Sequence, residues 1–162
     1  MRPLLATTLA LAALAVLSTG CAPAKPAGPA VITVKDGWSR PAPAGGTGAG
    51  FFELANSGGA ADTLVAVESP IAETVQIHES STEGGVMRMR IMTDGVTVKP
   101  GASVTFGPGG LHVMFIRLKS PLAAGDRAPA TLVFKDGGRK PIELTVRTAG
   151  GKSADDMAHH SH

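Results

Sequence analysis

Residues 48–68, GAGFFELANSGGAADTLVAVE, contain the pattern that decides the fold. Two short runs, 48–56 and 63–68, are rich in Phe, Leu and Val, and the turn-forming sequence NSGG begins at the end of the first run. Apolar runs of this length bounded by Asn, Ser and Gly are typical of β-strands joined by tight turns. This stretch therefore predicts two consecutive strands.

The same pattern recurs over most of the chain, with the turn sequences EGG, KPG, GPGG and KDGG between the runs. The 162 residues include 21 glycines and 12 prolines, which suits a protein rich in turns. The expected strands cover residues 31–35, 48–56, 63–68, 73–78, 86–92, 96–98, 103–106, 112–119, 130–135 and 142–147. Several short strands at regular spacing, without a helix-period segment among them, predict an all-β domain built as an antiparallel β-sandwich or barrel.

Composition excludes several classes of function. The formal net charge is only +2, so nothing favours a nucleic-acid partner, which would need a concentrated basic surface. Cys21 is the only cysteine, which excludes an internal disulfide framework and a cysteine-cluster zinc site. The sequence also lacks a Ser/His/Asp triad, a phosphate-binding glycine loop and paired carboxylates in a supporting context, so we expect no enzymatic activity.

The N-terminus has the features of an export signal. Residues 1–20 place Arg2 before an apolar run that is too short to cross a bilayer comfortably, which is typical of a secretory signal peptide. Cys21 follows small residues as in a lipoprotein lipobox, although Ser18 stands where that motif favours Leu, Val or Ile. We expect a lipid on Cys21 and a Pro/Ala-rich tether over 21–30; ordinary cleavage that leaves a free thiol is the alternative. The location expected is the periplasm or the outer face of the cytoplasmic membrane.

Histidine and methionine are unevenly distributed over the expected domain. It contains two histidines and four methionines. His112 and Met114 are two residues apart in one expected strand, so their side chains point to the same face. Met87 and Met89 likewise share a face of another strand, and a hairpin with the preceding strand would bring His78 near them. Whether the two groups meet depends on the fold.

Such residues suit monovalent copper. Thioether sulfur is soft and uncharged, and it prefers Cu(I) to harder ions. Imidazole adds a stronger neutral ligand, so two His and two Met side chains can form a neutral tetrahedral site. The alternative interpretation is structural, because a Met on a strand face usually fills the core and a His at a strand end is usually a solvated turn residue. The residues alone leave both interpretations open.

The spacing resembles that of the periplasmic copper chaperones of the PCuAC type. Their metal signature is a His, ten residues, a Met, just over twenty residues and then His-X-Met. Here His78 is followed by ten residues, Met89, twenty-two residues and His112-Val113-Met114. The flanking sequences HESSTEGGVMRMR, KPGASVTFGPGGLHVMF and GFFELANSGGAADTLVAVESPIA are also similar, and the resemblance covers roughly residues 31–147.

The resemblance implies a cupredoxin-like β-sandwich over 31–148 with a shallow, partly exposed Cu(I) site. It implies that His78, Met89, His112 and Met114 are the ligands, with Met87 as a second candidate for the role of Met89. Some members have a further Met directly after the first His, where this chain has Glu79. The implied role is delivery of copper to the dinuclear copper centre of cytochrome c oxidase, carried by its subunit II, directly or through a Sco-type thiol protein.

The last residues, 149–162, form a polar tail that we expect to be flexible and to provide a second metal site. Imidazole binds Cu(II) and other borderline ions well. The secondary candidates there are Met157, His159, His160 and His162. The alternative is a merely hydrophilic end or a cloning remnant.

Two other functions stay open at the level of sequence. The chain could be a copper-buffering or resistance lipoprotein without a dedicated acceptor. It could also be an immunoglobulin-like interaction module without metal, with its methionines in the core. Copper sensitivity of a deletion strain with normal oxidase activity would favour the first, and failure of the purified domain to take up Cu(I) would favour the second.

Overall fold

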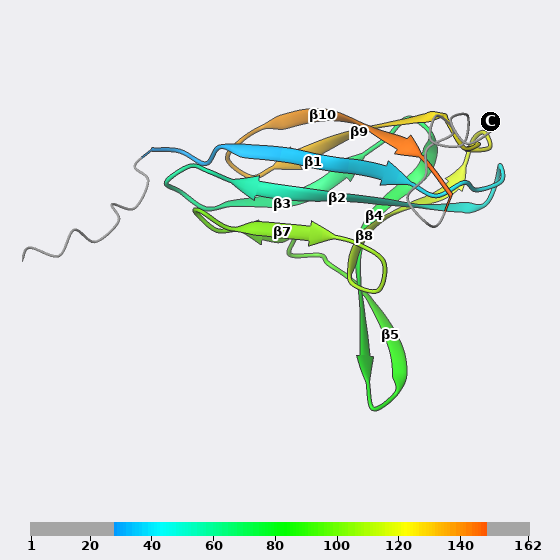
Figure 1. Ribbon diagram of the computed structural model, residues 1–162, viewed down its shortest axis with the longest axis horizontal. Helices are drawn as coiled ribbons and strands as arrows, with labels where there is room; N and C mark the ends of the chain where they lie inside the picture. Colours follow the sequence, from blue (N-terminus) through cyan, green and yellow to red (C-terminus); the bar gives the residue numbers. More distant parts are fainter. Residues whose placement is uncertain (1–27, 149–162) are drawn as a thin grey trace, which may run out of the picture.

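The computed structural model describes residues 28–148 and contains ten β-strands (Figure 1). The strands are β1 (Ile32–Ser39), β2 (Thr47–Asn56), β3 (Asp62–Glu68), β4 (Ala72–Glu83), β5 (Val86–Ile91), β6 (Val96–Val98), β7 (Ser103–Phe106), β8 (Leu111–Leu118), β9 (Arg127–Phe134) and β10 (Arg139–Val146). The predicted all-β fold is confirmed. No helix in this range is long and apolar enough to cross a membrane. The predicted signal peptide, Cys21 and the candidate ligands of the tail lie outside the described residues.

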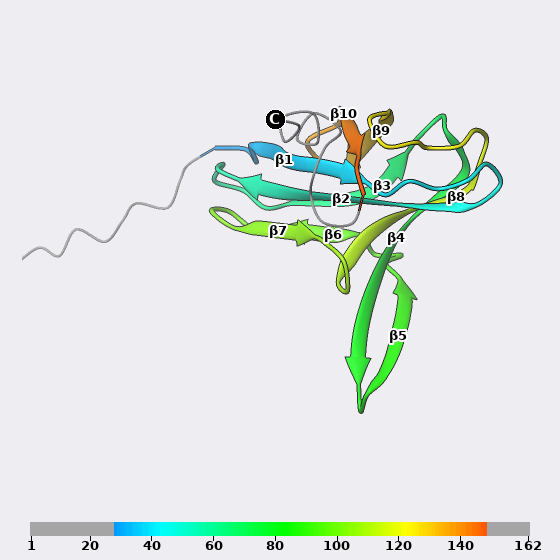
Figure 2. The same cartoon turned by 45° about the vertical axis from the view of Figure 1, so that its right-hand side comes forward.

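The strands form one continuous sheet that curls into a sandwich. Its order is β5-β4-β8-β7-β2-β1-β10-β9-β3-β6, and β8 also pairs with β2. Most pairings are antiparallel, as predicted, but β1 pairs with β10 and β7 with β8 in parallel. Figures 1 and 2 show β10 and β7 on opposite sides of the sandwich. The sheet is therefore mixed rather than purely antiparallel.

Apolar side chains from most of the strands fill the space inside the curl. The residues without exposed surface include Leu54, Leu64, Val98, Val113, Phe115, Leu132 and Leu144. On β8, Val113 and Phe115 face this core. Because side chains alternate along a strand, His112 and Met114 lie on the opposite face of β8. The core thus determines which face of the sheet presents the candidate ligands.

The turn that follows β2 is fixed by the side chain of Asn56. Its Oδ1 accepts hydrogen bonds from the backbone N–H groups of Val31 and Gly58, at 3.1 and 3.0 Å. Its Nδ2 donates to the carbonyl groups of Ala60 and Val98, at 2.8 and 3.1 Å. The buried amide therefore satisfies four backbone groups at once and connects three separate segments of the chain.

Strand β4 is longer than the sequence predicted. We expected a strand that ended at His78, but β4 continues to Glu83, and residues 79–83 are strand rather than turn. The turn itself consists of Gly84 and Gly85, whose φ angles of 59° and 80° suit a two-residue type I′ hairpin. Polar residues on both faces hid this extension, because the β4–β5 hairpin projects from the sandwich and has no core to face (Figures 1 and 2).

Candidate metal centre

Strands β5, β4 and β8 lie side by side and present the four candidate ligands on one face. His78 of β4 lies directly opposite His112 of β8, and opposed residues of antiparallel strands share a face. Met114 is two residues further along β8 and therefore lies on that face too. On the other side of β4, His78 is opposite Ile91 of β5, so Met89 is its diagonal neighbour on the same face. Three strands that are distant in sequence thus bring these residues together.

His78 contacts Met89 directly. The distance between His78 Nδ1 and Met89 Sδ is 3.1 Å, and His78 Nε2 lies 2.9 Å from Gln76 Oε1. An amide oxygen can only accept a hydrogen bond, so Nε2 carries the ring proton and donates it to Gln76. The lone pair of Nδ1 is therefore directed toward the thioether sulfur, which also offers only lone pairs for binding. A soft cation between the two atoms would satisfy both.

His112 is oriented by the backbone of the preceding turn. Its Nδ1 donates to the carbonyl group of Gly110 at 2.8 Å, which leaves the lone pair on Nε2. The same carbonyl accepts the backbone N–H of Ser80 in β4, at 3.0 Å. The rings of His112 and His78 have centroids 5.9 Å apart and meet edge to face at 63°. Both imidazoles are thus held by second partners in tautomers that keep one nitrogen free.

The environment of His78 favours its neutral form over its charged form. Partial burial of the ring lowers the pKa of His78, and the positive charge that His112 would carry lowers it further. A proton and a metal ion compete for the same lone pair of imidazole. Since the pKa is below its ordinary value, His78 stays in the ligating form to a lower pH than a solvated histidine would.

The methionines differ in position along this face. Met114 is half-buried, opposite Gln76 of β4 and Ala49 of β2. Met89 is 52% exposed, and Met87, which lies two residue pairs nearer to the turn, is 69% exposed. The register therefore places Met89 closer to His78 than Met87. Neither Met87 nor Met89 fills the core, which contradicts the structural interpretation for these two residues.

One side of the candidate site is buried in the protein, and the other side is exposed to solvent. His112 is only 5% exposed, whereas Met89 lies at the surface of the projecting hairpin. Neutral nitrogen and thioether donors at the boundary between protein and water fit a soft monovalent ion. Within residues 28–148, no three His, Cys, Asp or Glu side chains gather as a metal site of the harder kind. Gln76 was not among the residues predicted from sequence, although its position two residues before His78 on one strand face was a usable signal.

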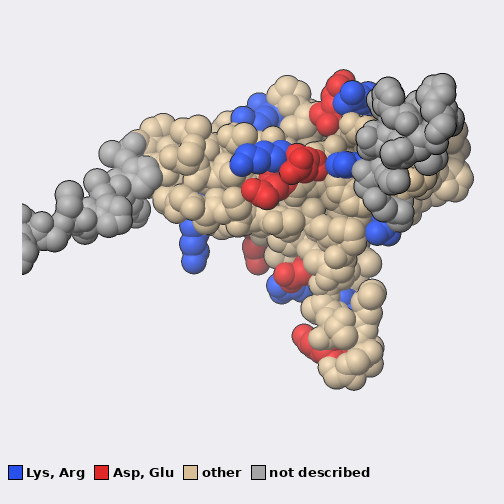
Figure 3. All heavy atoms as spheres, in the orientation of Figure 1, with Lys and Arg blue, Asp and Glu red and all other residues tan. Residues whose placement is uncertain are grey.

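The opposite face of the hairpin is charged. Arg90 is 2.6 Å from Glu79, and Arg88 is 3.5 Å from Glu83. Figure 3 shows acidic and basic side chains intermixed over the visible surface, including the hairpin. Strand β5 therefore has one face of thioether and apolar groups and one face of arginines that pair with glutamates of β4.

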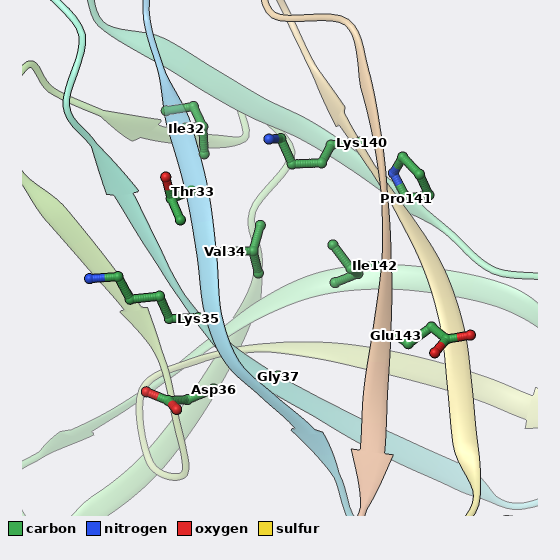
Figure 4. Close-up of a pocket in the computed structure, with 10 residues that line it drawn as sticks. All are labelled: Ile32, Thr33, Val34, Lys35, Asp36, Gly37, Lys140, Pro141, Ile142 and Glu143. Carbon is green, nitrogen blue, oxygen red and sulfur yellow. The ribbon is translucent and has the colours of Figure 1, made fainter.

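A separate groove of about 460 Å³ lies between β1 and β10, where the two strands diverge beyond their short parallel pairing. Figure 4 shows the residues that line it, with Asp36 and Glu143 directed to opposite sides. No histidine or methionine is among them. The groove is thus distinct from the candidate metal centre.

Comparisons with known proteins agree with this architecture. A family model described as "Putative lipoprotein LpqE-like" matches residues 32–146. The protein "Putative lipoprotein Lxx21020" of Leifsonia xyli subsp. xyli (strain CTCB07) is 33% identical over 157 residues, which cover 93% of each chain. A copper-bound PCuAC domain from PmoF2 is 28% identical, with a TM-score of 0.59, and the match covers 73% of this chain and 93% of that one.

A further solved structure is that of CuI-DR1885 from Deinococcus radiodurans, in solution. It is 25% identical with a TM-score of 0.55, and the match covers 71% of this chain and 78% of that one. The predicted resemblance to PCuAC-type domains and the predicted cupredoxin-like fold are thereby confirmed.

Proposed function

The chain belongs to the LpqE-like family, which is of the PCuAC type, and from that premise we propose that it is an exported Cu(I) chaperone rather than an enzyme. The observation that carries the proposal is the 3.1 Å approach of His78 Nδ1 to Met89 Sδ, beside His112 on one face. His78, Met89, His112 and Met114 are the proposed ligands. Copper is the cargo of the protein, and no chemical transformation is assigned to it.

The open end of the site gives a route for transfer. A carrier must hold its ion against weak ligands and still release it to a receiver. The imidazoles are fixed by Gln76 and by the Gly110 carbonyl, while Met89 is half exposed on the hairpin. A thiolate from a partner can approach from the Met89 side and replace the thioether while both imidazoles still hold the ion. Such stepwise exchange needs a site that is not closed on all sides.

We propose that the receiver is the dinuclear copper centre of cytochrome c oxidase subunit II, reached directly or through a Sco-type thiol protein. The resemblance to PCuAC-type chaperones is what supports this receiver. A deletion strain should lose oxidase activity under copper limitation and regain it with the intact gene but not with a Met89→Ala variant. Normal oxidase activity together with copper sensitivity would instead indicate a copper-buffering lipoprotein.

We propose a lipid anchor on Cys21, and the lipoprotein names of the family and of the Leifsonia relative support it. Mass spectrometry of the membrane fraction should find a diacylglyceryl adduct on this residue. A Cys21→Ser variant should be absent from the membrane fraction, because it lacks the thiol that carries the lipid. It should keep its Cu(I) affinity, because Cys21 is no part of the described domain. An unmodified Cys21 thiol in membrane-bound protein would contradict the anchor.

Gln76 should tune copper affinity without binding copper. A Gln76→Leu substitution removes the acceptor for His78 Nε2–H, so the ring can rotate or change tautomer and lose its orientation. Loss of an outer-shell partner of this kind typically costs about tenfold or more in metal affinity. Competition titration with a Cu(I) chelator measures the effect. Gln76→Glu, which keeps an acceptor at this position, should bind more tightly than Gln76→Leu, and equal affinities would contradict the role.

A further inference from the structure

We propose that the free edge of β5 is a docking strand to which a copper-exchanging protein adds an extended, acidic segment. The identity of this partner rests on the proposed function, but the docking edge itself rests on the geometry of β5. In the sheet order of residues 28–148, β5 is the terminal strand. All six of its residues are exposed, and it pairs with β4 without a bulge. Edge strands usually avoid pairing through Pro, bulges, shortness or charged side chains, and of these β5 has only the charges of Arg88 and Arg90.

The backbone groups that point away from β4 can be identified. The N–H of Met92 donates to the carbonyl of Ile77 at 2.8 Å, so this opposed pair is hydrogen-bonded. In antiparallel strands such pairs alternate with pairs whose backbone groups point outward. Counting along the register, the outward residues of β5 are Met87, Met89 and Ile91. Each offers an unpaired N–H and C=O to an added strand, including the proposed ligand Met89.

The side chains of β5 determine what kind of strand fits. Met87, Met89 and Ile91 form the thioether and apolar face, while Arg88 and Arg90 lie on the other. The carboxylates that pair with these arginines belong to β4, on the inner side. The arginines would therefore be the direct neighbours of an added strand. Because opposite charges across neighbouring strands are favourable, that strand should carry acidic residues at alternate positions.

A second copy of this chain is a poor occupant of the edge. An antiparallel β5–β5 pair centred on Arg88 would oppose the two copies of this arginine. A pair centred on Met89 would oppose Arg88 of one copy to Arg90 of the other. Like charges directly opposite each other destabilise a pairing. The arginines thus disfavour self-association while they favour an acidic partner.

The docked arrangement would also place the partner's alternate side chains beside the proposed metal site. A residue of the added strand opposite Met89 lies on the thioether face, with Cβ atoms about 5 Å apart. A thiol or thioether at that position would stand next to the proposed ligand that is easiest to displace. Docking at this edge therefore brings a receiving ligand to the open end of the site without movement of either histidine.

The probe that tests this inference is a labelled peptide, Glu-Val-Glu-Met-Glu-Val-Glu, mixed with the metal-free chain. The controls are the Lys-for-Glu peptide and a peptide of the same composition in which the charges do not alternate. Fluorescence anisotropy should give an affinity at least about tenfold higher for the acidic alternating peptide than for either control. Hydrogen exchange should slow at the amides of Met87, Met89 and Ile91 and change little at Arg88 and Arg90, whose amides already bond to β4.

Three variants separate docking from other effects. Met87→Pro removes an outward N–H but no bond to β4, and Met87→Val keeps that N–H without the thioether. Peptide affinity should fall about tenfold in the first and stay near that of the intact chain in the second. Arg88→Glu leaves one positive and one negative side chain on β5, so it should abolish the preference for the acidic over the basic peptide while the backbone stays intact.

Several results would overturn the inference. These are equal binding of all three peptides, exchange protection that does not follow the alternation, or a dimer of the metal-free chain that Arg88→Glu disrupts. Cu(I) affinity is measured separately on the same protein. Peptide binding without Cu(I) binding would refute the proposed function and leave the docking edge intact, and the reverse result would refute only the docking edge.

Discussion

Replacement of His112 by alanine should lower the Cu(I) affinity of the chain by more than about a hundredfold. This residue is the buried end of the site, and among residues 28–148 the only other imidazole is that of His78. Loss of an outer-shell partner alone costs about 10- to 100-fold, and loss of a nitrogen ligand should exceed that range. Competition with a Cu(I) chelator at fixed pH measures the change.

The control must separate ligation from folding, because His112 is buried. Ser39→Ala provides it, since Ser39 is equally hidden but lies on β1, away from the site. Both variants should keep the far-ultraviolet circular dichroism of a β protein, and only the histidine variant should lose copper. An intact fold with unchanged Cu(I) affinity in His112→Ala would reject the proposed ligand set.

The second large effect is a contrast between two neighbouring methionines. Met89→Ala should lower Cu(I) affinity by about a hundredfold, whereas Met87→Ala should change it less than about threefold. The physical reason is register, because Met89 touches His78 Nδ1 and Met87 lies two residue pairs further toward the turn. Both side chains are exposed on the hairpin, so neither substitution leaves a cavity in the core.

X-ray absorption provides an independent readout of this contrast. The copper-loaded intact chain should show two sulfur neighbours, and Met89→Ala should show one. The number should stay at two in Met87→Ala. A larger loss of affinity or of sulfur in Met87→Ala than in Met89→Ala would transfer the ligand role to Met87.

Local chemistry made much of the fold predictable from sequence. Strands β6 and β7 have the predicted bounds because glycine-rich turns mark their limits on both sides. The outer half of β4 was missed because its residues are polar on both faces and show no apolar alternation. The parallel pairing of β1 with β10 joins the two ends of the domain, and a local pattern contains no information about such a contact.

Part of the candidate site could likewise be predicted from sequence, and part of it could not. That His112 and Met114 share a face follows from the two-residue period of a strand. The approach of His78 to His112 depends on the register between β4 and β8, in which the core residues Ile77 and Val113 are directly opposed. The family resemblance predicted that His78 and His112 lie together, whereas the hydrogen bond from His78 to Gln76 was found only in the structure.

The backbone carbonyl group of Gly110 fixes both the ring of His112 and the adjacent part of β4. The oxygen of Gly110 accepts from the ring of His112 and from the main chain of β4 at once, and it belongs to a turn without any proposed ligand. A rotation of that peptide plane would release the imidazole proton to the other nitrogen and turn a donor atom into a blocked one. For the proposed ligand set, copper affinity would thus depend on a loop, so substitutions in 107–110 should change that affinity while every proposed coordinating atom is preserved.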